Sequence, residues 1–219
     1  MSVIRLLIVL CLTVLLGLCA GCQSNPMLRK QGMDALRAHD LAMAGARFAQ
    51  AVKQDPTDWK AHHYLGKVYL QQHRALDAKL ALEKSLAQRH DAVEKPMILD
   101  DLAEALYRLD QREQLAQLLV SAAKQSHAPY AFRRQGLYLQ KIEDIDGAIV
   151  AFAKAAHFGP GDPQPYIDLA NLYESTHRLE QARQSLRRAY GIEPKNSEVN
   201  RRLRAYGIIP GPTIALPVR

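Results

Sequence analysis

Small residues recur at an interval of about 34 along most of this 219-residue chain. One column has successive intervals of 34, 37, 33 and 34, and it consists of Gly32, Gly66, Ala103, Gly136 and Ala170. A second column consists of Ala44, Ala78, Ala116, Ala148 and Ala182, and four residues after each stands a large apolar residue, namely Phe48, Leu82, Val120, Phe152 and Leu186. A repeated unit of this length limits the fold to a stack of similar elements, because each unit contacts only its neighbours.

The glycines of the first column indicate where two helices approach each other closely. A glycine inside a helix costs about 1 kcal/mol relative to alanine, so helix propensity alone would not place one there repeatedly. Gly32, Gly66 and Gly136 are therefore predicted to lie mid-helix against the alanines of a second helix. Phe48 and Leu82 are predicted to fill the space beside that contact.

The pattern resembles the tetratricopeptide repeat, a helix–turn–helix unit of 34 residues. The fifth unit carries the resemblance best, with Tyr166, Leu169, Ala170, Tyr173, Ala182, Leu186, Ala189 and Pro194 at the family's spacings. The third unit departs from it, since a longer connection over 88–95 precedes it, it lacks a closing proline, and it has one residue too many between its helices. The resemblance implies an all-α, right-handed superhelical solenoid of about five repeats over 27–196.

Two segments follow the repeats. Residues 197–206, "SEVNRRLRAY", are predicted to form a capping helix that turns Val199 and Leu203 inward and ends at Gly207. Residues 207–219, "GIIPGPTIALPVR", form a proline-rich tail that cannot continue a helix but is too apolar for a simple linker.

A targeting segment precedes the repeats. Leu6 to Leu18 is an apolar run of 13 residues, which fits a secretory signal better than the roughly 20 residues of a membrane-spanning helix. Ala20-Gly21-Cys22 resembles a bacterial lipobox, although Cys19 stands where that family usually has leucine. The resemblance implies removal of residues 1–21, lipidation of Cys22 and a tether over 22–26; an uncleaved signal anchor is the alternative.

Cleavage at this point would leave Cys22 as the one cysteine, already lipidated, so disulfides and thiol catalysis are not expected. Two or more acyl chains anchor a protein stably, whereas a single chain does so only marginally. The residue after the cysteine is Gln23 rather than aspartate, and the resemblance therefore implies the periplasmic face of the bacterial outer membrane.

The sequence offers no catalytic or metal-binding constellation. It contains no HExxH motif, phosphate-binding glycine loop or nucleophile elbow. Three histidines share the turn position of their repeats, where φ tends to be positive and histidine is one of the enriched types: His39, His73 and His177. Neighbouring repeats lie at least about 8–10 Å apart, too far for a shared zinc ion. The adjacent His62 and His63 diverge on their helix and are predicted to be surface residues. We expect no enzyme, no metal and no cofactor other than the lipid on Cys22.

The net positive charge is confined to the C-terminal part. Residues 178–219 contain 9 basic and 3 acidic side chains, whereas 22–177 contain 19 of each. The basic face is predicted to consist of Arg183, Arg187, Arg188, Arg201, Arg202 and Arg204. It is either the polar cover that a capping helix needs or a contact for an anionic partner. Nucleic acid is not expected in the periplasm.

In the family that the repeats resemble, the first helices line the concave surface. The corresponding residues here are Lys60, His63, Lys67, Met97, Asp100, Glu104, Tyr130, Arg133, Leu137, Gln140, Ile167, Asn171 and Glu174. Asn171 matches an asparagine with which peptide-binding members hold a ligand's backbone. A clamp for a terminal carboxylate is not reproduced, because the third unit offers Asp100 and Glu104.

These features favour a non-enzymatic scaffold. The resemblance is to bacterial lipoproteins of this repeat class that serve pilus assembly and secretion machines, so the expected partners are proteins of the cell envelope. Two alternatives stay open: the basic C-terminal face binds an anionic polymer such as peptidoglycan or lipopolysaccharide, or the chain regulates a cell-wall enzyme.

The assignment of Cys22 as the lipid anchor predicts the behaviour of Cys22→Ala. The variant should accumulate as an unprocessed precursor that takes up no labelled palmitate, because the acceptor thiol is gone. Cys19→Ala is the matched control and should be processed and labelled normally. Cleavage and labelling of the Cys22 variant would contradict the assignment.

Overall fold

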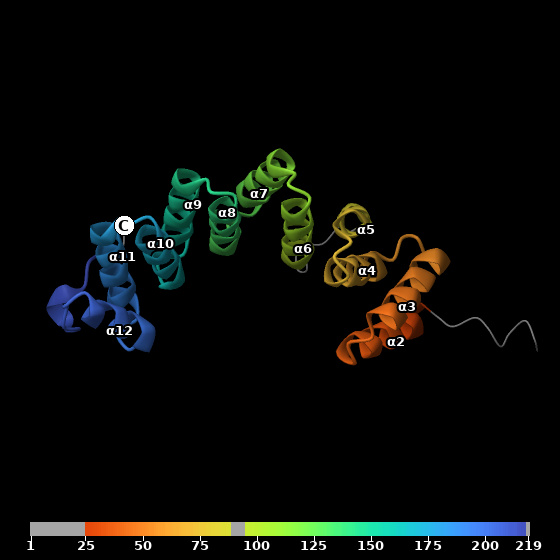
Figure 1. The fold of residues 1–219 in the computed structure, drawn as a ribbon, viewed down its shortest axis with the longest axis horizontal. Coiled ribbons are helices and arrows are strands. Elements are labelled where there is room, and N and C mark those ends of the chain that lie inside the picture. Colours follow the sequence, from red (N-terminus) through yellow and green to blue (C-terminus); the bar gives the residue numbers. More distant parts are fainter. Residues whose placement is uncertain (1–24, 89–94, 218–219) are drawn as a thin grey trace, which may run out of the picture. The chain divides into compact units, whose positions relative to one another are not determined.

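The computed structural model of the chain describes residues 25–88 and 95–217. All regular structure in these residues is helical, with eleven α-helices and one 3-10 helix (Figure 1), which confirms the all-α prediction. The predicted signal peptide over 1–21 and the lipidated Cys22 lie outside the described residues. Of the helices described, none is both long and apolar enough to cross a membrane.

The helices follow one another in pairs along the chain. In chain order they are α2 (Asn25–Arg37), α3 (Leu41–Gln54), α4 (Trp59–Gln71), α5 (Ala75–Gln88), α6 (Lys95–Arg108), α7 (Arg112–Ser126), α8 (Pro129–Lys141), α9 (Ile145–Phe158), α10 (Gln164–Ser175), α11 (Leu179–Ile192), α12 (Ser197–Ala205) and the 3-10 helix η1 (Pro212–Ile214). The chain divides into two compact units, one ending at Asp101 and the other beginning at Leu102. In the first unit α2 packs on α3 and α4 on α5; in the second α8 packs on α9 and α10 on α11.

The turn inside each helix pair has the same backbone conformation. Its central residue has a φ of 53° to 65°, in the left-handed region, and these residues are His39, His73, Asp110, Glu143 and His177. In the second pair, the amide of Arg74 donates to the carbonyl of Tyr69 at 2.8 Å, which closes the end of α4 in a Schellman-type motif. The predicted conformation of the three turn histidines is confirmed.

The turn of the third pair contains no extra residue. Asp110 follows the end of α6 by two positions, as His73 follows the end of α4. The predicted insertion is therefore wrong, and so is the choice of Val120, which is 37% exposed, as the large inward residue of α7. Leu119, only 2% exposed, takes that place. The spacing of small residues misplaces α7 by one residue, because the first of its inward-facing positions is Leu115, where the other repeats have alanine.

The glycines of α2, α4 and α8 lie mid-helix at a close contact with the following helix, as predicted, but the nearest atoms there belong mainly to the large side chain of that helix and not to its alanines. A Cβ atom on Gly66 would stand 2.6 Å from Cγ of Leu82. A Cβ atom on Gly136 would stand 2.5 Å from the ring of Phe152. Gly32 meets the ring of Phe48 in the same way. Even an alanine would force these side chains to move, so the helices of a pair could not keep their spacing.

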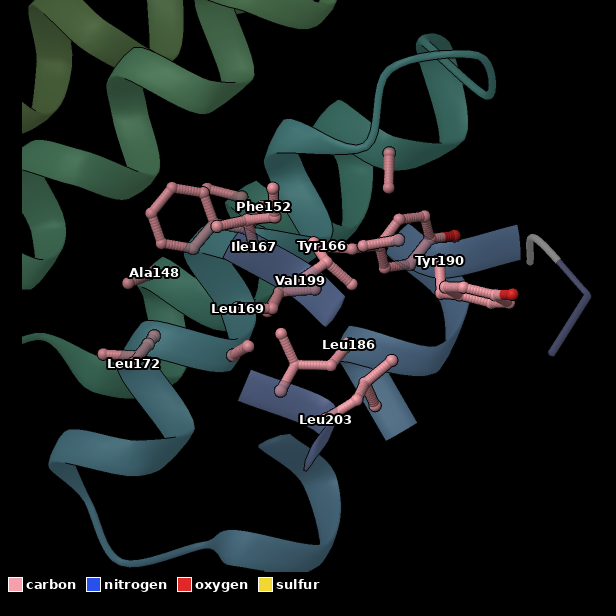
Figure 2. Close-up of a cluster of buried hydrophobic side chains, with 14 of the residues drawn as sticks. Ala148, Phe152, Tyr166, Ile167, Leu169, Leu172, Leu186, Tyr190, Val199 and Leu203 are labelled. Carbon is pink, nitrogen blue, oxygen red and sulfur yellow. The ribbon is translucent and has the colours of Figure 1, made fainter. Parts of the chain in front are cut away.

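The C-terminal repeat shares its core with the capping helix. Side chains from α9, α10, α11 and α12 converge on one buried cluster (Figure 2). Val199 and Leu203 of α12 are fully buried there, which confirms their predicted inward direction. Asn196 caps α12 by accepting a hydrogen bond from the amide of Val199 at 3.1 Å, and Gly207 ends the helix with a φ of 73°.

The proline-rich tail packs along α11 as far as the structure describes it, to residue 217. Ile208 and Ile214 lie against the C-terminal core. Nε of Arg187 donates to the carbonyl of Ile214 at 2.7 Å, and the amide of Leu216 donates to the carbonyl of Arg187 at 3.4 Å. A Cβ atom on Gly191 would stand 3.1 Å from the carbonyl of Leu216, so the tail passes close to this glycine.

The close contact inside the hairpins predicts a stability difference between two glycine substitutions. Gly66→Leu should lower the free energy of unfolding by about 1–3 kcal/mol, because the added side chain overlaps Leu82. Gly161→Leu is the matched control, since a Cβ atom there meets nothing within 4 Å. Thermal or denaturant unfolding followed by circular dichroism measures both; equal stabilities for the two variants would refute the close helix contact.

Candidate functional site

The first unit contains five of the predicted groove residues, on α4 and α6, and of these Met97 is exposed. Lys60 and Asp100 are exposed and Lys67 is half-buried. His63 is only 4% exposed, and its Nε2 lies 2.7 Å from Oδ2 of Asp101. His63 therefore joins α4 to α6 and does not present an open surface to a ligand.

The neighbouring His62 is buried as well, and its Nε2 lies 3.0 Å from the carbonyl oxygen of Pro56. The prediction of surface positions for His62 and His63 is wrong. Adjacent helical side chains do diverge, but α4 is covered on more than one side, so each of the two rings reaches a different covering segment.

A basic pocket lies between α2 and α4, on the same unit. Its volume is about 310 Å³, and it is lined by Pro26, Arg29, Lys30, Met33, Asp34, Arg37, Lys60 and Tyr64. The α2 members recur every three or four residues and so share one face of the helix. Of these residues, the groove predicted from the sequence includes Lys60 alone, because it begins in the second repeat. The same spacing, applied to α2, would have found the others.

Two of the four cations in this pocket are neutralised. Arg29 forms an ion pair with Asp58 at 2.5 Å, and Asp58 also accepts hydrogen bonds from Asn25 at 2.9 Å and from the amide of Ala61 at 3.1 Å. Arg37 pairs with Asp34 at 2.7 Å.

The other two cations of the basic pocket, Lys30 and Lys60, are exposed and have no carboxylate partner among the described residues. The ammonium group of Lys60 lies 5.3 Å from the ring centroid of Trp59, a contact that leaves its charge in place. The basic pocket therefore carries two uncompensated positive charges.

In the second unit, Glu104 is held by three donors. Its carboxylate accepts from Nε of Arg108 at 2.8 Å, from Nζ of Lys141 at 3.1 Å and from the hydroxyl of Tyr138 at 3.3 Å. Burial raises the pKa of Glu104, but the hydrogen bonds and charges of Arg108 and Lys141 outweigh it and hold the pKa below its ordinary value of 4.5. Glu104 thus links α6 to α8 instead of facing a ligand alone.

Two further predicted residues of the second unit are also engaged with neighbouring helices. Arg133 pairs with the buried carboxylate of Asp168 at 2.5 Å, which joins α8 to α10. Glu174 accepts from the hydroxyl of Tyr206 at 2.8 Å and pairs with Arg202 at 2.9 Å, which joins α10 to the end of the capping helix.

Three predicted groove residues of the second unit remain open. Tyr130 is 51% exposed and Leu137 is 36% exposed, and they stand seven residues apart, two turns along one face of α8. Asn171 of α10 is exposed, and its side chain has no hydrogen-bond partner among the described residues. We refer to Tyr130, Leu137 and Asn171 as the α8–α10 strip, because the Arg133–Asp168 pair holds the two helices together beside it.

The six arginines of the predicted basic face are not equivalent. Arg202 pairs with Glu174, Arg187 holds the tail and Arg183 pairs with Glu180. Arg188 is half-buried and lines a pocket of about 200 Å³ between α9, α10 and α11. Arg201 and Arg204 are exposed and have no partner among the described residues.

The part of the chain that the structure describes contains no group of three or more His, Cys, Asp or Glu side chains placed to hold a metal ion. The turn histidines His39, His73 and His177 are exposed. What the described surface offers is binding chemistry: exposed aromatic, apolar and amide groups in one unit and a cationic pocket in the other.

Comparison with known proteins matches this architecture. A family model described as tetratricopeptide repeat matches residues 142–205. MamA of Desulfovibrio magneticus is similar in structure, with a TM-score of 0.62 at 15% identity over 81% of this chain and 99% of that one. YrrB, described as a repeat protein of this class with an unusual peptide-binding site, has a TM-score of 0.54 at 21% identity over 81% and 89%.

PilF of Pseudomonas aeruginosa is also similar, with a TM-score of 0.59 at 19% identity over 84% of each chain. At these identities the likeness concerns the fold. No curated protein sequence matched the chain significantly.

The lowered pKa of Glu104 predicts a pH-dependent cost of Glu104→Gln. A carboxylate whose pKa is lower in the folded state stabilises that state above its unfolded pKa, and this stabilisation is lost as the pH falls through the folded pKa. The variant should be less stable than the parent chain at pH 7, and the gap should narrow as the pH falls below the ordinary glutamate pKa of 4.5 and through the lowered pKa of Glu104. Denaturant unfolding at several pH values measures the gap, with the exposed Glu113→Gln as control. A gap that does not change with pH would exclude the carboxylate charge as its source.

Proposed function

Because residues 142–205 are tetratricopeptide repeats and the described chain has the fold of proteins that carry them, we propose that it is a non-enzymatic protein-interaction scaffold. Stacked helical repeats create extended surfaces suited to binding other chains. The observation that supports this role most directly is the α8–α10 strip, where Tyr130, Leu137 and Asn171 remain open while the charged residues beside them are paired.

The strip suits an extended protein segment. Tyrosine is enriched at the residues that dominate binding energy, because it buries a large rigid area and keeps a polar end. Leu137 adds apolar area on the same face, and Asn171 offers one acceptor and two donors to a peptide backbone. The neighbouring charges are already satisfied, so a partner would not need to supply a matching charge there.

The proposed location is the cell envelope, with the chain anchored through lipid on Cys22 at the periplasmic face of the outer membrane. The support is the apolar run, the lipobox-like Ala20-Gly21-Cys22 and Gln23 after it. A scaffold fixed to a membrane would hold its partner at that surface, as expected for assembly of a pilus or secretion complex.

A second candidate function is binding of an anionic envelope polymer through the C-terminal end. It is favoured by Arg201 and Arg204, which are exposed and unpaired within the described chain. Contacts between exposed charges weaken as the Debye length falls from about 10 Å at 0.1 M to about 3 Å at 1 M salt. Sedimentation with purified sacculi that is lost on adding salt would therefore favour this candidate, whereas a salt-resistant protein complex would favour the scaffold.

The scaffold proposal predicts where a partner can be cross-linked in cells. A photo-reactive amino acid at position 130 should give an adduct with a defined envelope protein. The same amino acid at position 150, where Val150 is 54% exposed on the second helix of its pair, is the control and should give none.

Tyr130→Ala combined with Leu137→Ala should lower co-purification of the partner identified by cross-linking, measured without a photo-reactive group, about tenfold or more, since truncating an interface hot spot costs about 2 kcal/mol or more. Equal adducts at positions 130 and 150, or unchanged recovery with the double variant, would place the interaction elsewhere.

A further inference from the structure

The basic pocket between α2 and α4 is not needed by the scaffold proposal, which uses the second unit. Its size, about 310 Å³, is at the lower end of the range of small-ligand sites and corresponds to a compact group. The lining combines cations with Met33 and Tyr64, so it presents both charge and apolar area.

The charge of the basic pocket is complementary to an anion. Its two arginines are engaged by Asp58 and Asp34, while the ammonium groups of Lys30 and Lys60 lack a carboxylate partner within the described chain. Lys60 also stands beside the ring of Trp59, and tryptophan is a residue type enriched at membrane interfaces. A negatively charged ligand would therefore meet two uncompensated charges in this pocket.

The position of the pocket along the chain indicates which anionic molecule it would meet. Pro26, which lines the pocket, is four residues after Cys22. Four extended residues span at most ~14 Å, so a lipid on Cys22 would hold the Pro26 end of the pocket no further than that from the membrane surface. Tethering at such a distance gives a high effective concentration of headgroups at the pocket.

We propose that the α2–α4 pocket binds the headgroup of an anionic phospholipid in the membrane to which the chain is anchored. The inference rests on the proposed lipidation of Cys22. The bound headgroup supplies a second attachment beside the acyl chains, and basic groups next to an acyl chain are a known way to strengthen membrane binding. Because the contact is made by α2 and α4 together, it also fixes which face of the first repeat meets the bilayer.

The test uses a chain that begins at Gln23 and so keeps every described residue but carries no lipid. It should sediment with vesicles of phosphatidylcholine that contain phosphatidylglycerol, and not with vesicles of phosphatidylcholine alone. Lys30→Gln combined with Lys60→Gln should lower the partition coefficient ~25-fold, since one lysine near an anionic surface contributes about fivefold.

The matched control is Lys53→Gln combined with Lys154→Gln, which removes the same charge from exposed positions on α3 and α9, outside the pocket. It should bind as the parent chain does, and circular dichroism should show equal folding of both variants. Equal loss for the two pairs would mean nonspecific attraction, and no binding of the parent chain to anionic vesicles would also overturn the proposal.

A pocket variant that loses its cross-linked protein partner while still binding vesicles would assign the pocket to a protein, again against the proposal. The vesicle-binding results are independent of the labelling of Cys22 and of cross-linking at position 130. Failure of the pocket can therefore be told apart from failure of the anchor or of the scaffold function.

Discussion

The close contact between the two helices of a hairpin is the constraint on which the rest of the structure depends. A glycine on the first helix lies directly against a large side chain of the second, as Gly66 lies against Leu82 and Gly136 against Phe152. The missing Cβ atom sets the helix spacing, and the spacing sets where the apolar faces stand for the next hairpin. A glycine that weakens its own helix by about 1 kcal/mol thus makes the packing of the stack possible.

This part of the fold could be predicted from the sequence because close helix packing requires small residues at fixed positions, and these can be recognised in the sequence. The alternation of small and large residues identified the hairpins, and the histidines at His39, His73 and His177 identified turns with positive φ. The register of α7 was missed because Leu115 occupies a position where alanine was expected. Leu115 is fully buried, so whether leucine or alanine fits there depends on the space that the surrounding helices leave.

The candidate site was predicted less well, for a physical reason. Helical spacing tells which residues share a face, but it does not tell whether two charges on neighbouring repeats will meet. Arg133 reaches Asp168 and Glu104 reaches Lys141, so several residues expected to bind a ligand instead bind the next helix. His63 is buried for the same reason, by its contact with Asp101. The surface that remains open is smaller and more apolar than the sequence indicated.

These contacts between repeats also bear on how such a chain can evolve. Loss of the hairpin formed by α8 and α9 would take Lys141 from Glu104 and Arg133 from Asp168. Asp168 is buried, and a buried carboxylate without its cation is strongly destabilising. Duplication or deletion of a single repeat is the simplest genetic route to a longer or shorter solenoid. Among the repeats after residue 101, such a change would leave charged residues without their partners. Repeats of nearly the same length and shape are therefore not interchangeable there.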